Sequence, residues 1–222
     1  MSDPLPFERW PPVLGRDAFL VTPSNRAAAA WIDRWPDWPG PALALHGPSG
    51  AGKSHLAAVW RERAGGWVVE GPALDEDRAA ELAQAHAALV IEAADQAPET
   101  ALFHLYNMMA ERRGHLLLVA REPPARWPVR LPDLRSRLGT VPLAPITAPD
   151  DQLIRAVLIK LFDDQQLKVA PDIIDFLALR IERSFAAAVR VVAAIDRESL
   201  EQLRPITVPM VRSVLERLSH AS

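Results

Sequence analysis

Residues 47–54 combine the residue types and the spacing that bind a phosphate chain. They satisfy the pattern G-x-x-x-x-G-K-[ST] at every fixed position. The glycines allow successive backbone N–H groups to turn toward one anion, Lys53 would contact the β- and γ-phosphates, and the Ser54 hydroxyl would bind Mg²⁺. We therefore expect a nucleoside di- or triphosphate and Mg²⁺ to bind here, with His55 either beside the phosphates or packed into the core. The residues expected to contact the nucleotide are Gly47, Pro48, Ser49, Gly50, Ala51, Gly52, Lys53, Ser54 and His55.

The segments on either side of this loop supply the context that the pattern requires. Residues 42–46 are apolar and predict a strand that leads into the loop, and residues 53–64 predict a helix that leaves it. The N-terminus of that helix would add partial positive charge beside the phosphates. The alternative is a glycine-rich turn that binds nothing, and the lysine, the hydroxyl and both flanks argue against it.

The composition of the chain excludes several classes of protein. Of its 222 residues, 49% are hydrophobic and 24% are charged, as in ordinary globular proteins. A net charge of −3 argues against a free-standing polyanion-binding protein, and the lack of cysteine excludes disulfides and thiolate metal sites. The six histidines have no metal-ligand spacing. Because neither a signal peptide nor a membrane-spanning apolar run is evident, we expect a cytoplasmic protein with no membrane partner.

Apolar runs alternate with helical patterns between residues 42 and 143, which is typical of a parallel α/β sheet. The expected strands are residues 42–46, 67–70, 87–92, 115–120 and 140–143. The expected helices between them are residues 53–64, 77–86 and 99–113. Ser24 and Asn25 would cap a further helix over residues 26–35. The tryptophans near the N-terminus would pack this segment onto the core; they are Trp10, Trp31, Trp35 and Trp38.

Beyond a joint marked by prolines, the chain has an all-helical pattern. The prolines are Pro142, Pro145 and Pro149. Four apolar stripes at helical spacing follow and predict four short helices. They are Leu153, Val157, Leu161 and Phe162; Ile173, Ile174, Leu177 and Ile181; Val189, Val192, Ile195 and Leu200; and Val208, Val211, Val214, Leu215 and Leu218. We expect an extended arm over residues 1–17, an α/β nucleotide-binding core with a five-stranded parallel sheet over residues 18–146, and a small helical lid over residues 147–222.

Four segments resemble sequences of the DnaA family of AAA+ proteins, and most closely those of its short Hda-type members. Residues 19–25 resemble the stretch beside the adenine, and Leu-Phe-His-Leu-Tyr-Asn at residues 102–107 resembles the helix after the Walker B strand. Leu-Pro-Asp-Leu-Arg-Ser-Arg-Leu at residues 131–138 resembles the box that carries the arginine finger, and residues 206–211 resemble the start of the last lid helix. The resemblance extends over nearly the whole chain and implies a P-loop AAA+ core that binds ADP or ATP.

The resemblance also implies partners. Hda-type proteins bind the sliding clamp on DNA and trigger hydrolysis of the ATP bound to the replication initiator DnaA, which prevents re-initiation. The printed sequence stops at Ser222, so we expect no helix-turn-helix domain and no direct sequence-specific DNA binding. The start of the chain weakly resembles the peptide that such proteins insert into the clamp, with Leu5 and Phe7 as apolar anchors; the alternative is a tail without a partner. Self-association into a homo-oligomer through Arg137 is also open.

Two arginines are given roles by the same resemblance. Arg137 matches the arginine finger, which would stabilise charge on the phosphoryl group of the initiator's ATP. Arg135 is two residues away and would point elsewhere. Arg183 matches the sensor 2 position, from which it would reach this chain's own nucleotide. The alternatives are a solvated surface arginine for Arg137, and for Arg183 a surface charge pair with Glu182 or another neighbour.

The Walker B segment departs from the family pattern of two acidic residues at the end of a strand. Glu92 takes the place of the aspartate on the metal side, and Ala93 takes the place of the second acidic residue. Alanine accepts no proton and orients no water, and at sensor 1 the family's polar residues are replaced by Ala120-Arg121. We therefore expect Mg²⁺ at Ser54 and Glu92 and a bound adenine nucleotide, with weak or absent hydrolysis by the chain itself.

Three other classes of function stay open. An autonomous AAA+ ATPase of helicase-loader type would hydrolyse ATP by itself, which the pair Glu92-Ala93 argues against. A P-loop nucleoside or nucleotide kinase does not need the arginine-finger box. A DNA-bound nucleoid factor is disfavoured by the acidic balance and by the missing DNA-binding domain.

Overall fold

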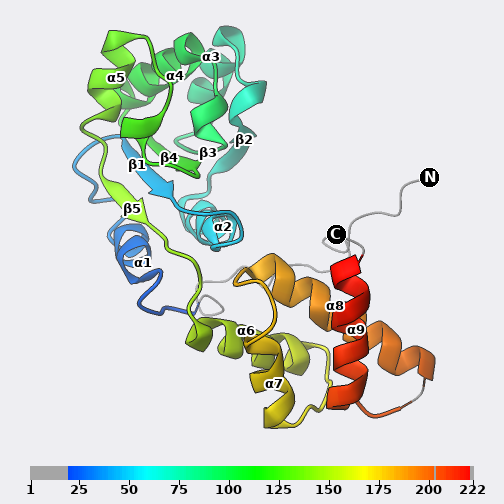
Figure 1. Ribbon diagram of the computed structural model, residues 1–222. Coiled ribbons are helices and arrows are strands. Elements are labelled where there is room, and N and C mark those ends of the chain that lie inside the picture. Colours follow the sequence, from blue (N-terminus) through cyan, green and yellow to red (C-terminus); the bar gives the residue numbers. More distant parts are fainter. Residues whose placement is uncertain (1–19, 203, 221–222) are drawn as a thin grey trace. The chain divides into compact units, whose positions relative to one another are not determined.

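The computed structural model describes residues 20–202 and 204–220, which fall into two compact units (Figure 1). The first unit ends at Thr147 and the second begins at Ala148. The first is an α/β unit and the second is helical. Each unit has a hydrophobic core of its own, so we describe each separately.

Five parallel strands form the sheet of the first unit. The strands are β1 (Ala42–His46), β2 (Trp67–Glu70), β3 (Ala88–Glu92), β4 (His115–Ala120) and β5 (Leu143–Pro145). Their order across the sheet is β2-β3-β4-β1-β5, and every pairing is parallel. The predicted five-stranded parallel α/β fold is therefore confirmed. Because all strands run the same way, their carboxyl ends meet at one edge of the sheet, where such folds bind ligands.

Helices cover both faces of this sheet (Figure 1). One face carries α1 (Arg26–Asp33) and α2 (Lys53–Ala64), and the other carries α3 (Glu76–Ala85), α4 (Glu99–Glu111) and α5 (Pro132–Leu138). Three short 3₁₀ helices join the elements: η3 (Gly71–Ala73), η4 (Ala94–Gln96) and η5 (Pro124–Arg126). Side chains alternate between the two cores along β1, β3 and β4. Leu116 and Leu118 pack toward α3 and α4, whereas Leu117 packs toward α1 and α2.

Aromatic side chains close the core beneath α1 and α2. Trp38 stacks on Trp60 with ring centroids 5.4 Å apart, and Trp35 meets Trp60 edge to face at 6.2 Å. His115 lies against both Trp35 and Trp38. The prediction that the early tryptophans pack this segment onto the core is confirmed for Trp31, Trp35 and Trp38. Trp10 lies outside the described residues.

Two local predictions in this unit are wrong. The last strand was expected at residues 140–143 but begins at Leu143, because the backbone N–H groups of Thr140 and Val141 donate to Arg137 and Leu138 and form a turn after α5. Asn25 precedes α1 but does not cap it through its side chain. Its amide instead accepts from the Thr22 N–H and donates to the Leu20 carbonyl, both at 2.9 Å, and so fixes the preceding loop.

The second unit consists of four helices around one apolar core. They are α6 (Asp151–Asp164), α7 (Pro171–Ala178), α8 (Phe185–Gln202) and α9 (Val208–His220). The Asp150 carboxylate accepts from the Leu153 N–H at 2.7 Å, and the Ser184 hydroxyl accepts from the Ala187 N–H at 3.1 Å, so side chains satisfy the first turns of α6 and α8. The four-helix prediction is confirmed. In α8, Val192 and Ile195 are buried as expected, whereas Leu200 is exposed and Val189 is only partly buried; Ala188 and Val191 complete the buried face.

Candidate nucleotide-binding site

The loop between β1 and α2 has the backbone that a phosphate-binding turn needs. β1 ends at His46 and α2 begins at Lys53, so the loop lies at the carboxyl edge of the sheet. Gly50 and Gly52 have φ angles of 71° and 97°, in the left-handed region that glycine adopts without strain. A Cβ atom at Gly47 would lie 2.0 Å from the Ile146 carbonyl oxygen, so no larger residue fits there. The glycines in this pattern are therefore structurally required here.

The Lys53 side chain folds back over the loop. Its ammonium donates to the carbonyl oxygens of Gly47 and Pro48 at 2.7 and 2.8 Å. Burial lowers the pKa of Lys53, while the negative charge of Glu92 opposes that shift. A lysine ammonium has three donors and these bonds use two of them, so the group is held over the loop with one donor left for a phosphate oxygen.

Ser54 and Glu92 come together from neighbouring parts of the fold, α2 and the end of β3. Burial raises the pKa of Glu92, and a hydrogen bond from the Ser54 hydroxyl acts in the opposite direction. Glu70 raises the pKa of Glu92 further, and Lys53 lowers it. A hydroxyl and a carboxylate side by side are the oxygen donors that Mg²⁺ takes in phosphate sites, where waters and phosphates complete its shell. This pair therefore fits the predicted metal ligands.

Ala93, directly after Glu92, has a left-handed backbone with φ 48° and ψ 45°. Its carbonyl accepts from the Gln96 N–H at 2.9 Å and lies where a Cβ atom on Gly71 would be only 2.4 Å away. The chain thus turns sharply here, between β3 and η4. The nearest acidic alternative is Asp95, whose charge raises the pKa of Lys53 while Arg121 lowers it. Both residues therefore belong to the electrostatic surroundings of the loop.

The two histidines beside the loop are placed differently. His46 ends β1, and burial lowers its pKa against the opposing charge of Glu122. His55 lies in the first turn of α2 and is half-buried. Its contact with phosphate stays a prediction. Across residues 20–202 and 204–220, no three His, Asp or Glu side chains form a metal-binding group, so the Ser54 and Glu92 pair would need ligands from the nucleotide and water.

Arg137 lies in the last turn of α5 and is exposed. Its guanidinium carbon is 5.7 Å from the ring centroid of Phe103 and 5.6 Å from that of Tyr106, both on α4. Arg135 points elsewhere, because its guanidinium donates to the Val129 carbonyl. Burial raises the pKa of Tyr106, and the charge of Arg137 opposes that shift. Phe103 is half-buried and Tyr106 is buried, so an exposed arginine that lies on their rings is partly oriented and yet accessible to a partner.

The remaining predicted site residues belong to the second unit or lie outside the described residues. Arg183 precedes α8 in the second unit and forms an ion pair with Asp151 at 2.9 Å. Glu182, its suggested alternative partner, instead lies 3.9 Å from Arg190. The sensor 2 role of Arg183 stays a prediction. Leu5 and Phe7 lie outside the described residues, so their clamp contact also stays a prediction.

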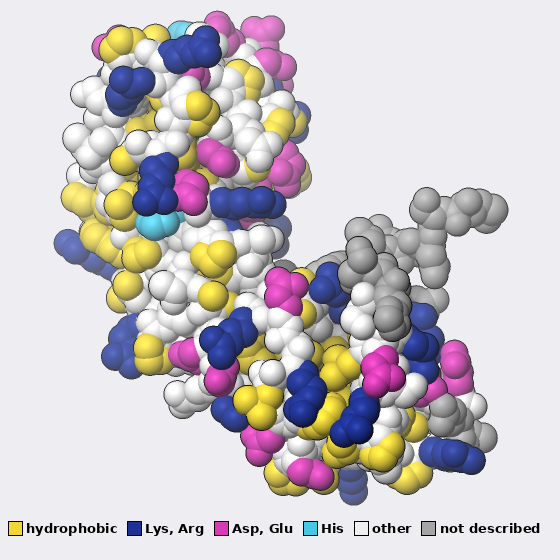
Figure 2. Space-filling model, in the orientation of Figure 1, with side chains coloured by type: hydrophobic (Ala, Val, Ile, Leu, Met, Phe, Trp, Pro, Cys, Tyr) yellow, Lys and Arg dark blue, Asp and Glu magenta, His cyan; other side chains and the backbone are white. Residues whose placement is uncertain are grey.

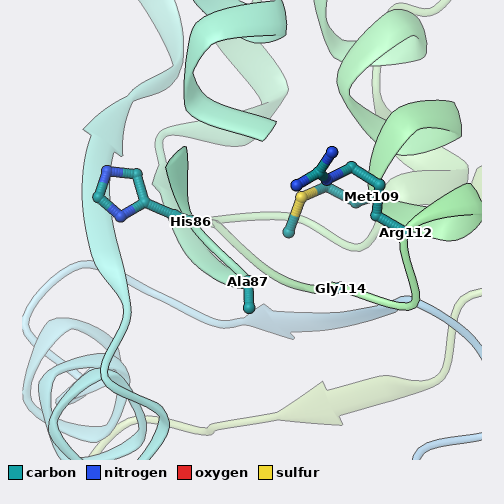
Figure 3. A pocket seen from close by; sticks show the side chains of 5 residues that line it. All are labelled: His86, Ala87, Met109, Arg112 and Gly114. Carbon is teal, nitrogen blue, oxygen red and sulfur yellow. The ribbon is translucent and has the colours of Figure 1, made fainter. Parts of the chain in front are cut away.

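A separate hollow of about 310 Å³ opens at the opposite edge of the sheet, near the amino ends of β3 and β4 (Figure 3). Its lining residues are His86, Ala87, Met109, Arg112 and Gly114. The Arg112 guanidinium donates to the Gln84 carbonyl at 3.3 Å, and the His86 ring stacks on Trp67. None of the predicted site residues lines this hollow, so the candidate nucleotide site and the hollow are separate features.

Sequence reasoning missed a contact that bears on the arginine box. Glu99, the first residue of α4, accepts hydrogen bonds from the backbone N–H groups of Arg130 and Leu131. These partners are 31 and 32 residues away along the chain. A glutamate at the start of a helix is ordinary in sequence, so no local signal distinguishes this one.

A family model for the lid domain of Hda matches residues 150–215. Among solved structures, domain III of the replication initiation protein DnaA of Thermotoga maritima is 15% identical, with a TM-score of 0.80 over 93% of this chain and 97% of that chain. DnaA of Aquifex aeolicus with AMPPCP is also 15% identical, with a TM-score of 0.71 over 87% of this chain and 68% of that chain.

A third structure, the initiator DnaA bound to AMPPCP and single-stranded DNA, is 15% identical, with a TM-score of 0.71 over 87% of this chain and 67% of that chain. At such identities the likeness shows the fold alone: this chain has the fold of these DnaA structures over 87–93% of its length. The match to the lid model adds an independent likeness in the helical unit, where its range covers α6, α7, α8 and the first part of α9.

Proposed function

We propose that this chain, a DnaA-family, Hda-like AAA+ protein, is a regulatory adaptor in DNA replication. In this proposal it binds ADP or ATP with Mg²⁺ and, together with the DNA-loaded sliding clamp, stimulates ATP hydrolysis by the initiator DnaA. The initiator would then be switched off after a round of replication. The observation that carries the proposal is the exposed Arg137 on the rings of Phe103 and Tyr106.

The surroundings of Arg137 support a role toward a partner's nucleotide. The Arg137 side chain is exposed, and its guanidinium lies over the α4 rings of Phe103 and Tyr106. Its guanidinium therefore belongs to the outer surface formed by α4 and α5. An arginine supplied in trans stabilises charge on the transferring phosphoryl group, and such a residue contributes roughly 10³–10⁵ in rate.

Nucleotide binding by this chain rests on the loop after β1. Its backbone N–H groups and Lys53 would hold the phosphates, and Ser54 with Glu92 would hold Mg²⁺, which neutralises phosphate charge when bound. Two of the similar DnaA structures contain AMPPCP, which supports an adenine nucleotide here as well. Arg183 would complete the site as sensor 2 by exchanging its ion pair with Asp151 for a phosphate oxygen.

Weak self-hydrolysis follows from the residues around this loop. Ala93 presents a methyl group where the family has an acid, and no proton can move to it. Ala120, which ends β4, likewise offers no polar group at sensor 1. Glu92 is engaged by Ser54 and is suited to holding a metal. The chain is therefore expected to retain nucleotide for long periods and to act on a partner.

The charge distribution of this chain is consistent with a protein partner. Basic and acidic side chains are interspersed on the face shown in Figure 2, and the net charge is −3. In the described part of the chain, no helix has the length and apolar character needed to cross a bilayer. We place the protein in the cytoplasm, with the initiator as partner and Leu5 and Phe7 as clamp anchors. Association of several copies through Arg137 stays open.

The decisive experiment measures hydrolysis of labelled ATP preloaded on the initiator, with clamp-loaded DNA present. The wild-type chain is expected to accelerate hydrolysis, and Arg137→Ala is expected to abolish that acceleration. Arg126→Ala is the matched control, since Arg126 is an exposed arginine near α5 that pairs with Glu122. Equal rates with wild type and Arg137→Ala would refute the finger assignment, and no acceleration by wild type would refute the adaptor function.

A second candidate, an autonomous ATPase of helicase-loader type, is favoured by one observation. The Ser54 hydroxyl is hydrogen-bonded to Glu92, an arrangement suited to holding the Mg²⁺ of a hydrolytic site. Multiple-turnover ATPase by the purified chain alone, lost in Lys53→Ala, would establish this alternative in place of the adaptor.

A further inference from the structure

The carboxylate of Glu99 is bound by two consecutive backbone amides. The Arg130 N–H is 2.9 Å from each of its oxygens, and the Leu131 N–H is 2.6 Å from Oε2. These bonds hold the pKa of Glu99 below its usual value. The carboxylate is therefore ionised at neutral pH and makes charge-assisted hydrogen bonds, which are stronger than neutral ones.

These amides belong to the segment that leads into α5. Leu131 precedes the first helical residue, Pro132, which has no N–H group of its own. A second bond holds the same segment, because the Arg135 guanidinium donates to the Val129 carbonyl. Residues 129–131 are thus fixed through both their donors and their acceptors. The start of α5 is tied to α4 and cannot shift independently.

One face of α4 contacts both ends of the arginine box. Glu99, Phe103 and Tyr106 occupy positions i, i+4 and i+7, which lie on the same side of a helix. Glu99 holds the segment before α5, while the rings of Phe103 and Tyr106 lie against Arg137 in its last turn. α5 is only seven residues long, so a shift at its start would carry directly to Arg137.

We propose that Glu99 is the positioning residue for Arg137: its carboxylate, bound to the amides of Arg130 and Leu131, fixes where the finger guanidinium is presented to the partner. The inference rests on the proposed function, because it assigns a residue to the same reaction. Glu99 itself touches no reacting atom. Its effect comes through the orientation of α5, and a misplacement of about 1 Å in a catalytic group can cost about a hundredfold in rate.

The test uses three variants of the full chain. Glu99→Ala removes both acceptor oxygens, Glu99→Gln keeps one acceptor without the charge, and Glu111→Ala removes an exposed carboxylate from the other end of α4. Amide hydrogen exchange at Arg130 and Leu131 reports the bonds directly. Initiator ATP hydrolysis, titrated with each variant on clamp-loaded DNA, separates the maximal rate from the half-saturating concentration. ADP binding to each variant checks that the nucleotide site is intact.

We expect exchange at Arg130 and Leu131 to rise about tenfold in Glu99→Ala. The maximal stimulated rate should fall about tenfold to a hundredfold, with half-saturation and ADP affinity as in wild type. Glu99→Gln should have an exchange rate and a maximal stimulated rate between those of wild type and Glu99→Ala. Glu111→Ala should match wild type in both rates. A lower maximal rate with unchanged half-saturation and ADP affinity is specific to a positioning role. A folding defect would also weaken ADP binding, and a docking defect would raise the half-saturating concentration.

Three outcomes would overturn the inference. The first is unchanged amide exchange at Arg130 and Leu131 in Glu99→Ala. The second is a wild-type maximal rate in Glu99→Ala despite faster exchange. The third is a rise in the half-saturating concentration of Glu99→Ala with no change in its maximal rate. The failure of the proposed function looks different: the wild-type chain itself then gives no stimulation, and the positioning role falls with it.

Discussion

At the scale of single residues, Lys53 links the shape of the phosphate loop to its charge. Its ammonium holds the carbonyls of Gly47 and Pro48, and burial already lowers its pKa. Removing it would therefore delete its two bonds to the loop and a cation that we expect to contact the phosphates. The backbone of the loop depends on glycines and not on Lys53, so the fold should survive the change.

Lys53→Ala should weaken ADP and ATP binding by about 10- to 150-fold, the equivalent of losing charge-assisted bonds worth about 1.5–3 kcal/mol. Titration with a fluorescent adenine nucleotide measures the loss. Lys168→Ala, at an exposed lysine of the second unit, is the control and should bind as wild type does. If Lys53→Ala bound nucleotide with unchanged affinity, the loop would not be the nucleotide site.

Ala93 offers a gain-of-function test of the same site. Aspartate tolerates the left-handed backbone that Ala93 adopts, so Ala93→Asp should fold and add the missing acid after Glu92. We expect measurable ATP turnover in this variant above the wild-type rate, and its loss when Lys53→Ala is combined with it. Turnover no higher than in wild type would mean that a different group, such as Ala120 at sensor 1, limits hydrolysis.

At the scale of elements, sequence patterns predicted what is local and missed what is not. β1, the glycine-rich loop and α2 are contiguous, and their predicted bounds at residues 42–46 and 53–64 agree with the structure. β5 was misplaced because its position depends on pairing with β1, where Leu143 lies opposite Ala44 about a hundred residues away. Its few residues between prolines carry too little periodicity to fix a strand without that partner.

The candidate site also has a local part, which the sequence predicted, and a nonlocal part, which it did not. Gly47, Lys53 and Ser54 form one motif, so their proximity was predictable from spacing. The bonds from Arg130 and Leu131 to Glu99 join two segments that only the folded packing of α4 and α5 brings together. The Asn25 side chain was misassigned as a cap for a related reason, since its amide satisfies backbone groups before the helix.

We expect His115 to make the stability of the first unit depend on pH. It begins β4 with its ring 5.7 Å from Trp35 and 5.8 Å from Trp38, and burial lowers its pKa despite a hydrogen bond with the backbone of Pro36. Since the pKa is lower in the folded state than the usual 6.5, the unfolded chain binds the proton more readily. Stability is then full above about pH 6.5 and falls as the pH drops toward the folded pKa.

The melting temperature of the wild-type chain should fall between pH 7 and pH 5.5, and His115→Gln should make that fall smaller. Each kcal/mol of stability that protonation of His115 removes corresponds to a difference of about 2–4 °C in melting temperature. Melting curves at stepped pH measure it. His104→Gln, at an exposed histidine on α4, is the control and should retain the wild-type slope. Because the pKa of His46 is also lowered, some slope should remain in His115→Gln. An unchanged slope in His115→Gln would contradict the assignment.

At the scale of the whole molecule, two separate cores mean two cooperative units. The sheet unit is held by layers on both its faces, and the helical unit by a single cluster around α6, α7, α8 and α9. A helical unit of about 70 residues buries a smaller share of its surface than a larger domain does. It should therefore open at lower free energy than the sheet.

Matched core truncations in the two units would test this independence. Leu177 on α7 and Leu117 on β4 are both fully buried, and each Leu→Ala change should cost about 2–5 kcal/mol. Because each side chain packs within one core only, Leu177→Ala should speed amide exchange across α6 to α9 while the sheet stays protected. Leu117→Ala should speed exchange in the sheet alone. Uniformly faster amide exchange across both units in either variant would show that the sheet unit and the helical unit unfold together as one cooperative unit.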